Sequence, residues 1–428
     1  MTDIIADTGG AGDRDEAEGL DPARVNLMDP AIQACPFDAY KTLRDVAPVY
    51  RMPDLGMYVV TRYDDLHAVL RNTTELSMKK AGSLVRTPAA RKVFEEKGLR
   101  RYYAMGDDPP VHTAYRQIVD QAFTAGRIRR LVPYIERVVD DLIDKMPDDE
   151  DVDFVKAFCV PLPLIMITRI LGLPAEDMPR LKEWSDYWVE VHSYSLSPER
   201  ELLVAQKGVE LQEYLLEWFD RKRSNPQEDL ITDIAQGLYN GERPLNINEA
   251  VSLAEHVLVG GNETTTNGLA MAMRLMIETP GLESRLRDEP EKIKVFVEEA
   301  LRLQSPTQGL ERQVVQDMEL HGTFIPKGSV IHIRFGAANR DERHFTDPDV
   351  LDLDRRNAAS HMAFGQGTHH CLGSPLARQE MNSAFERLLA RRMGFALSEG
   401  RNRFEFVETL ALRIPRDLWI RSETTQPA

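Results

Sequence analysis

The sequence is poor in cysteine and contains no long apolar segment. Its three cysteines, Cys35, Cys159 and Cys371, are far apart in a chain of 428 residues. An odd number of widely spaced thiols excludes a disulfide framework and is typical of a protein in a reducing cytoplasm. No run approaches the roughly 18 consecutive apolar residues that a membrane-spanning helix needs. We therefore expect a cytoplasmic protein without a membrane partner.

The sequence also has fewer basic than acidic residues. The chain has 53 Lys and Arg against 69 Asp and Glu, which gives a formal net charge of −16. This balance argues against nucleic acid or an anionic membrane as a partner of the whole protein. A local basic patch could still bind an acidic partner.

The two ends of the chain differ in composition from its middle. Residues 1–24 are rich in Asp, Gly and Ala and lack the apolar core of a signal peptide. We predict a disordered lead-in over 1–24, a single domain over 25–422 and a loose C-terminal tail over 423–428. The domain contains no internal repeat or low-complexity linker, and we expect it to be a monomer.

Helical periodicity dominates the middle of the sequence, with strand patterns on either side. Apolar residues recur at intervals of three and four in segments 131–146, 157–171, 178–194 and 202–221. Before them we expect a helix over 38–45 and strands over 49–52 and 57–61. After them we expect a helix over 291–303, strands within 319–335, an irregular stretch over 337–360 and a final helix over 372–393. The pattern predicts a mainly α fold with a minor β region.

The longest helix is expected to follow Asn246. This residue suits the N-cap position, and Glu249, three residues later, completes a capping box. Pro280 marks the end of the helix. A helix of about 30 residues is roughly 45 Å long, so we expect it to cross the whole molecule.

The segment 364–373 places glycines and histidines around a cysteine just before a helix. The glycines permit a tight loop and the close approach of a flat ligand. A helix N-terminus favours a thiolate over a thiol, and a thiolate beneath a haem iron assists O–O cleavage. A lone cysteine is more often a small buried hydrophobe. The run His369, His370 and Cys371 also suggests zinc, although a structural zinc site needs four ligands. The local residues leave these alternatives open.

The pattern F-G-x-G-x-H-x-C-x-G resembles the haem-binding signature of the cytochrome P-450 family. All six fixed positions match, at Phe364, Gly365, Gly367, His369, Cys371 and Gly373. The resemblance implies haem b as cofactor, Cys371 as the axial iron ligand and His369 as a donor to a haem propionate. Phe364, Gly365 and Gly373 would also contact the cofactor. It further implies the cytochrome P-450 fold, with haem between the long central helix and the cysteine-loop helix.

A second motif, Gly260-Gly261-Asn262-Glu263-Thr264, lies in the middle of the long helix. Glycine and threonine are poor helix formers, so the local interpretation is a kink or a close helix contact. The segment also resembles the oxygen-activation motif of the same family. That resemblance implies Thr264 as a catalytic alcohol, Glu263 as its acid, and Gly261 beside the cofactor, with O₂ as co-substrate. An acid next to an alcohol can relay protons.

Other motifs of the family provide scaffold and cofactor contacts. Glu299 and Arg302 resemble the structural E-x-x-R pair, and either Arg355 or Arg356 would be its third member. The run 108–116, D-P-P-V-H-T-A-Y-R, resembles a segment whose His112 and Arg116 bind haem propionates, and Arg312 lies where the family has another propionate partner. The resemblance extends from about residue 36 to 418.

The distal side of the pocket is predicted from the helix periodicity. Val257 and Gly260 share a face with Thr264, and His256 and Val259 flank that face. We also expect the loop before Met105, residues 187–194, and Gln308 and Leu310 to line the pocket. His256 has two interpretations, a core histidine bonded to a neighbouring helix or a polar anchor for substrate.

The resemblance implies a monooxygenase acting on a lipophilic small molecule such as a terpenoid, steroid, fatty acid or aromatic compound. The chain has no flavin or iron–sulfur motif, so electrons would come from a separate ferredoxin and its reductase. A candidate basic patch for this partner consists of Arg116, Arg129, Arg130 and Arg378. The alternatives are a haem-thiolate peroxygenase or isomerase, against which Glu263 and Thr264 argue, and a haem protein that binds ligands without turnover.

Overall fold

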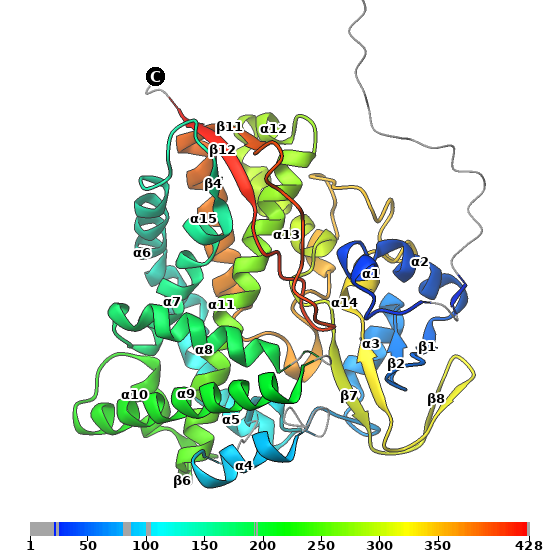
Figure 1. Ribbon diagram of the computed structural model, residues 1–428, viewed down its shortest axis with the longest axis vertical. Coiled ribbons are helices and arrows are strands. Elements are labelled where there is room, and N and C mark those ends of the chain that lie inside the picture. The colour runs from blue at the N-terminus through cyan, green and yellow to red at the C-terminus, as the bar shows by residue number, and fades with distance from the viewer. Residues whose placement is uncertain are drawn as a thin grey trace, which may run out of the picture.

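The computed structural model describes residues 21–22, 25–79, 87–99, 104–191, 193 and 196–425. Helices account for most of these residues, and the strands are short. Figure 1 shows a helical part built around α11 and, beside it, a smaller part that contains β1, β2, β7 and β8. The expected fold class, mainly α with a minor β region, is confirmed.

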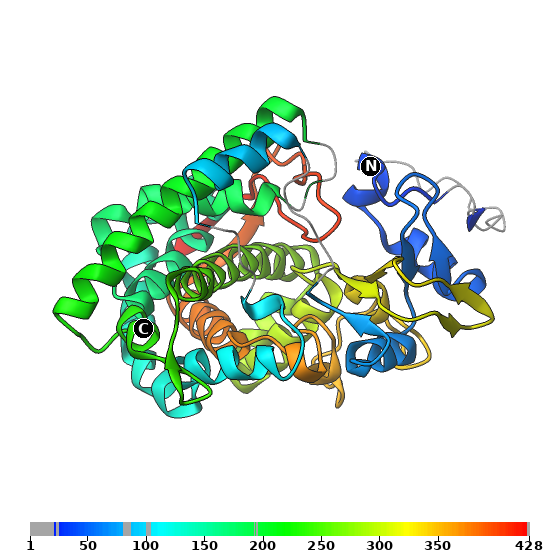
Figure 2. The same ribbon diagram turned by 90° about the horizontal axis from the view of Figure 1, so that it is seen from below.

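Helix α11 (Ile247–Glu278) is the longest element and runs through the middle of the helical part (Figures 1 and 2). Its capping box is present: Asn246 Oδ1 accepts from the Glu249 N–H at 3.1 Å, and Glu249 carboxylate oxygen accepts from the Asn246 N–H at 2.8 Å. The predicted start and end of this helix are therefore confirmed.

The other helices of the helical part pack around α11 and bury their apolar faces in one large cluster. They are α5 (Val111–Asp120), α6 (Ala125–Ile143), α7 (Pro161–Leu171), α8 (Met178–Glu190), α9 (Pro198–Ser224), α10 (Leu230–Gln236), α12 (Leu282–Asp288), α13 (Ile293–Leu303) and α15 (Ser374–Arg391). A π-helical turn, Val155–Cys159, precedes α7. The predicted helix over 178–194 ends earlier, at Glu190, and Tyr194 lies outside the described residues.

The smaller part centres on a five-stranded sheet with the order β1-β2-β10-β7-β3. Its strands are β1 (Val49–Arg51), β2 (Tyr58–Val60), β3 (Leu76–Ser77), β7 (Leu310–Val314) and β10 (Val330–Ile333). Short helices accompany it, namely α1 (Pro30–Ala34), α2 (Phe37–Val46), α3 (Tyr63–Arg71) and α14 (Phe335–Ala338). β2 and β10 run parallel although they are far apart in the sequence. Figure 2 shows these blue and yellow segments side by side.

Three further pairings are small. β8 (Met318–Leu320) pairs with β9 (Thr323–Ile325), and β5 (Leu238–Tyr239) pairs with β6 (Arg243–Pro244). β11 (Arg392–Leu397), β12 (Trp419–Thr424) and β4 (Val152–Asp153) form the third sheet. Helix α4 (Pro88–Glu96) packs on α9.

Two expectations near the C-terminus were wrong. The final helix ends at Arg391, and residues 392–397 form β11, because Arg392 and Met393 pair with Thr424 and Glu423 of β12. For the same reason Glu423 and Thr424 belong to a strand and not to a loose tail. Most of the expected lead-in, 1–20 and 23–24, and residues 426–428 lie outside the described residues.

Candidate active site

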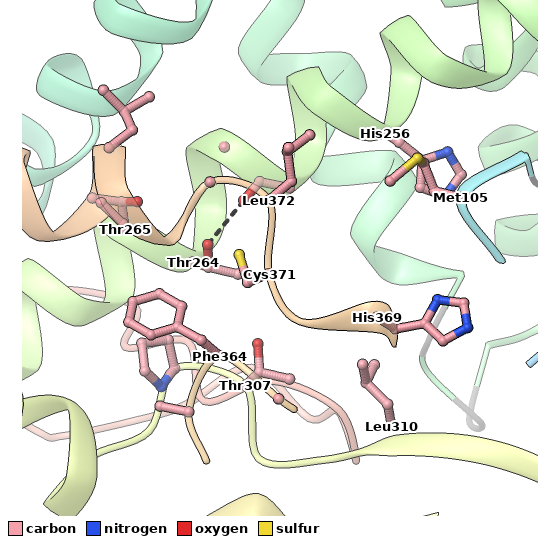
Figure 3. Close-up of a pocket in the computed structure, with 18 of the residues that line it drawn as sticks. Met105, His256, Thr264, Thr265, Thr307, Leu310, Phe364, His369, Cys371 and Leu372 are labelled. Atoms are coloured by element: carbon pink, nitrogen blue, oxygen red, sulfur yellow. Dashed lines mark hydrogen bonds between the residues drawn. The ribbon is translucent and has the colours of Figure 1, made fainter. Parts of the chain in front are cut away.

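Helix α11 and the cysteine loop form opposite walls of a mostly apolar cavity of about 290 Å³. Thr264 faces it from α11, and Cys371 faces it from the loop before α15 (Figure 3). Phe364, Gly365, His369 and Gly373 complete the loop side. The sequence motifs, more than 100 residues apart, therefore meet at one cavity.

The backbone of the cysteine loop requires its glycines. Gly365 and Gly367 have φ values of +64° and +70°, which side chains disfavour. A Cβ at Gly367 would also lie 2.9 Å from the Leu70 carbonyl oxygen of α3. Across the loop, the Cys371 N–H donates to the Phe364 carbonyl at 2.9 Å. This bond fixes Cys371 relative to the start of the loop.

The surroundings of the Cys371 thiol have opposing effects. Burial raises its pKa, while the N–H groups of Gly373 and Ser374 and the charges of Arg116 and Arg378 oppose that rise. The balance leaves the pKa above its usual value, so the free thiol keeps its proton at neutral pH. A coordinated metal would displace that proton. Within the described residues no group of three or more His, Cys, Asp or Glu could hold a metal ion, so the His369–Cys371 run does not form a zinc site.

Hydrogen-bonding groups gather around His369 at one edge of the cavity. His112 is buried, and neither of its ring nitrogens has a hydrogen-bond partner in the part of the chain that the structure describes. Its ring centroid is 4.2 Å from that of His369. Burial, His112 and Arg312 lower the pKa of His369 to about 3. Arg312 lines the same cavity. Buried donors of this kind need acceptors, and the carboxylates of a haem would supply them.

Arg116 is less directly placed. Its Nε donates to Asp120 at 2.7 Å, and its Nη1 donates to the His370 carbonyl at 2.7 Å. Arg116 is absent from the residues that line the cavity, so its role as a propionate partner stays a prediction. In this arrangement it connects α5 to the cysteine loop.

Helix α11 stays α-helical through its two glycines. A Cβ at Gly261 would lie 2.8 Å from Ile167 Cδ1, so this glycine permits the close packing of α7. The Thr264 hydroxyl donates to the Gly260 carbonyl at 2.9 Å, as the dashed line in Figure 3 shows. Thr265, the next residue of the helix, also lines the cavity.

Glu263 does not line the cavity. It is buried, and its Oε1 lies 3.1 Å from Lys182 Nζ of α8. Burial raises its pKa, Lys182 lowers it and Asp186 raises it, and the net shift is upward. Successive residues of a helix are 100° apart, which explains why Glu263 and Thr264 face different neighbours. A proton relay between them stays a prediction.

Four of the six residues expected to form the substrate pocket line the cavity, namely His256, Val257, Gly260 and Leu310. Val259 and Gln308 do not line it, and those two expectations were wrong. Val259 lies five residues before Thr264, about 140° round the helix. Gln308 is buried towards α2, where its Oε1 accepts from the Tyr40 hydroxyl at 2.8 Å and its Nε2 donates to the Ser305 carbonyl at 2.7 Å.

Sequence reasoning missed several lining residues. Leu70 of α3 and Met78 reach the cavity from the smaller part of the molecule. Their own sequence context is unremarkable, so only the fold identifies them. Met105 lines the cavity, but residues 100–103 of the loop before it, and His192 and Tyr194 of the expected segment 187–194, lie outside the described residues.

His256 has features of both interpretations. Its ring lines the cavity near Met105 (Figure 3), and it packs edge-on against Trp188 of α8 with centroids 5.7 Å apart. Its Nδ1 lies 2.8 Å from the Ser252 carbonyl, one turn earlier in α11. A carbonyl can only accept, so Nδ1 carries the ring proton.

The buried pair of Glu299 and Arg302 has a third partner in the structure. Arg302 donates to Glu299 at 2.6 and 2.9 Å, and Arg355 donates to Glu299 Oε2 at 3.0 Å. Arg356 is exposed, so the structure selects Arg355. Arg302 and Arg355 also donate to the carbonyl of Val350, which ties α13 to the irregular stretch before the cysteine loop.

The comparisons with known proteins agree with this site. The family model for cytochrome P-450 matches residues 181–400. The chain is 34% identical over 358 residues to cytochrome P-450 109 of Bacillus spizizenii, covering 83% of this chain and 84% of that protein. It is 33% identical over 389 residues to the mycinamicin IV hydroxylase/epoxidase of Micromonospora griseorubida, covering 89% and 94%. The solved structure of cytochrome P-450 CREJ in complex with (4-ethylphenyl) dihydrogen phosphate superposes with a TM-score of 0.85 at 28% identity, covering 91% of this chain and 97% of that one.

The chain belongs to the cytochrome P-450 family and has its fold. It is a P-450 monooxygenase, an oxidoreductase whose cofactor contains haem iron. In the part of the chain that the structure describes, no helix is both long enough and apolar enough to cross a membrane.

Proposed function

We propose that the chain inserts one atom of O₂ into a lipophilic small molecule, typically as a hydroxylation, with haem b held between α11 and the cysteine loop. The observation that carries the proposal is that the Cys371 thiol and the Thr264 hydroxyl face one mostly apolar cavity from opposite walls. An apolar wall with few polar groups suits a terpenoid, steroid, fatty acid or aromatic substrate. The free cysteines, Cys35, Cys159 and Cys371, support a cytoplasmic location.

The residues around the cavity have separate tasks in this proposal. Bound haem supplies the oxygen chemistry. Cys371 would hold the haem iron through its sulfur, and the N–H groups of Gly373 and Ser374 would stabilise the negative charge there. His112, His369 and Arg312 would hold the propionates, because His369 and Arg312 line the cavity and His112 packs against His369. The apolar side chains exclude water and orient the substrate by its shape.

Thr264 controls protons at the other wall. Its hydroxyl hydrogen points to the Gly260 carbonyl, so its oxygen lone pairs can accept a hydrogen bond from the cavity. Glu263 supplies protons from the α8 side of α11, where Lys182 and Asp186 surround it. This relay requires a water molecule or a rotation of Glu263, because its carboxyl group does not line the cavity.

We further propose that a ferredoxin and its reductase deliver two electrons at the cysteine side. Arg129 and Arg130 are exposed at the start of α6, and Arg116 lies beside the cysteine loop. Arg378 is a weaker member of this patch because Glu298 engages its guanidinium. Salt screens such contacts, so the reduction rate should fall with ionic strength and in Arg129→Glu. A reduction rate that changes neither with ionic strength nor in Arg129→Glu would contradict this docking site.

The test of function is a reconstituted reaction. Lipophilic compounds are first screened for a blue shift of the Soret band, and the best binder is incubated with ferredoxin, reductase, NADH and ¹⁸O₂. We expect a product with one labelled oxygen atom and a ferrous–CO Soret band at the long wavelength of haem-thiolate proteins. Cys371→His should bind haem and lose that band. Product formed from peroxide alone, or no turnover with any binder, would favour the peroxygenase or the ligand-binding alternative.

A further inference from the structure

Three charged residues from different segments meet behind the cysteine loop. They are Glu298 of α13, His361 just before the loop, and Arg378 of α15. Arg378 Nε and Nη2 donate to the two carboxylate oxygens of Glu298 at 2.6 and 2.9 Å. His361 Nε2 lies 3.1 Å from Glu298 Oε2. Glu298 therefore has two partners, one on each side of the loop in sequence.

Both partners contact the first residue of the loop. The Arg378 guanidinium lies 4.4 Å from the centroid of the Phe364 ring, and the His361 ring centroid is 5.8 Å from it. His361 Nδ1 also accepts from the Ala363 N–H at 3.2 Å. Phe364 lines the cavity, and its carbonyl accepts from the Cys371 N–H. A continuous set of contacts thus connects Glu298 to the backbone of Cys371.

The cluster is well shielded from solvent. The side chains of His361, Glu298 and Arg378 are 0%, 14% and 29% exposed. Burial raises the pKa of Glu298, but the adjacent His361 ring and the hydrogen bonds from Arg378 outweigh it and lower the pKa to about 2. Glu298 is therefore ionised at any physiological pH. A charge-assisted pair in such surroundings is stronger than an exposed one.

Glu298 differs in this respect from its neighbour Glu299. Glu299 turns to Arg302 and Arg355 and holds the stretch before the loop. Glu298 instead pairs with His361 and Arg378, and Arg378 packs on Phe364, the first residue of the cysteine loop. Two adjacent carboxylates of α13 therefore support two successive segments of the chain.

We propose that Glu298 is a positioning residue for the cysteine loop: its carboxylate holds His361 and Arg378 against Phe364 and so fixes the backbone that carries Cys371. This inference rests on the proposed function, in which Cys371 binds the haem iron. Glu298 itself touches no reacting group. Its loss should loosen the loop and make the iron–thiolate bond easier to lose.

The experiment follows the ferrous–CO Soret band of the haem-loaded protein in mild denaturant. We expect Glu298→Gln to lose the thiolate band roughly 10- to 100-fold faster than the wild type, the range implied by loss of one charge-assisted hydrogen bond. Glu298→Asp, which keeps the charge, should be intermediate. Glu291→Gln is the matched control, because it removes an exposed charge just before α13 and should leave the rate unchanged.

A double-mutant cycle separates positioning from general destabilisation. If the pair acts through one contact, Arg378→Gln should add little to the effect of Glu298→Gln. The reduction potential of Glu298→Gln should also shift, because the charge near the ligand changes. Equal band-loss rates in the wild type, Glu298→Gln and Glu291→Gln would overturn this inference alone. Absence of the thiolate band in the wild type would instead overturn the proposed function and this inference with it.

Discussion

The two walls of the cavity are held together by different kinds of interaction. On the cysteine side, buried charges meet in pairs and triads, such as Glu299 with Arg302 and Arg355. On the distal side, the wall consists mainly of small and apolar residues of α11, such as Val257, Gly260 and Gly261. Charged pairs need a defined geometry, whereas apolar contacts tolerate exchange of side chains of similar volume. The charged cysteine side therefore suits the chemistry that members of the family share. The apolar distal side suits a substrate that differs from one relative to another.

The strongest test of this division is at Thr264, the polar group of the distal wall with a proposed chemical role. Thr264→Ala should still consume NADH but divert it to peroxide, with product formation reduced roughly 10²–10⁴-fold, the usual loss when one positioned proton donor is removed. Thr266→Ala is a matched control, because the Thr266 hydroxyl donates to the Cys159 carbonyl away from the cavity. Peroxide and product are measured per NADH. Unchanged coupling in Thr264→Ala would mean that the distal wall has no catalytic alcohol there.

The second prediction concerns the charged wall. Arg355→Ala removes one of three donors to the buried Glu299 Oε2, which keeps Arg302 and the Asp352 N–H, and should lower the free energy of unfolding by about 1.5–3 kcal/mol. Arg356→Ala, next to it but exposed, should change the free energy by less than about 0.5 kcal/mol. Thermal unfolding of the two haem-loaded variants measures the difference. Similar losses in both would show that the triad is not a specific support.

The third prediction concerns Glu380 of α15, which differs from the paired carboxylates Glu298 and Glu299. It is buried, neither carboxyl oxygen has a partner within the described residues, and burial raises its pKa well above the usual value. The folded state then binds a proton that the unfolded state releases. Stability should fall as pH rises above about 4.3, by up to about 1.4 kcal/mol per pH unit.

This pH dependence can be removed by substitution. Glu380→Gln should unfold at a higher temperature than the wild type at neutral pH and at a similar temperature near pH 4. Glu386→Gln, exposed on the same helix, should follow the wild type throughout. Melting curves between pH 4 and 8 provide the measurement, and parallel curves for the wild type and Glu380→Gln would show that Glu380 has an unseen polar partner.

The smallest predicted effect concerns His256 on the apolar wall. If its ring anchors a substrate oxygen, His256→Leu should weaken binding of an oxygenated substrate by about 0.5–1.5 kcal/mol, the net contribution of one hydrogen bond. A hydrocarbon analogue should bind as before. Soret titrations with both ligands make the comparison. Equal losses would leave His256 as a core residue that packs on Trp188.

Much of the site could be predicted from the sequence because its motifs are local. The cysteine loop and the Gly260–Thr264 motif each fit within ten residues, and the capping box at Asn246 and Glu249 was correct in detail. The pocket wall was less predictable. A helical wheel places Val257 and Gly260 correctly, but it cannot show that Leu70 or Met78 contributes to the same wall from another part of the chain.

The sequence by itself determined the family and the cysteine loop through the resemblance of their motifs, and the fold class and the extent of α11 through helix periodicity and capping. Only the tertiary structure decided that Arg355 and not Arg356 joins Glu299, that Glu263 faces Lys182, and that Glu298 pairs with His361 and Arg378. It also showed that Glu423, which we expected in a loose tail, belongs to strand β12. Each of these outcomes depends on contacts between residues distant in sequence, and such contacts exist only once the helices and sheets have packed together.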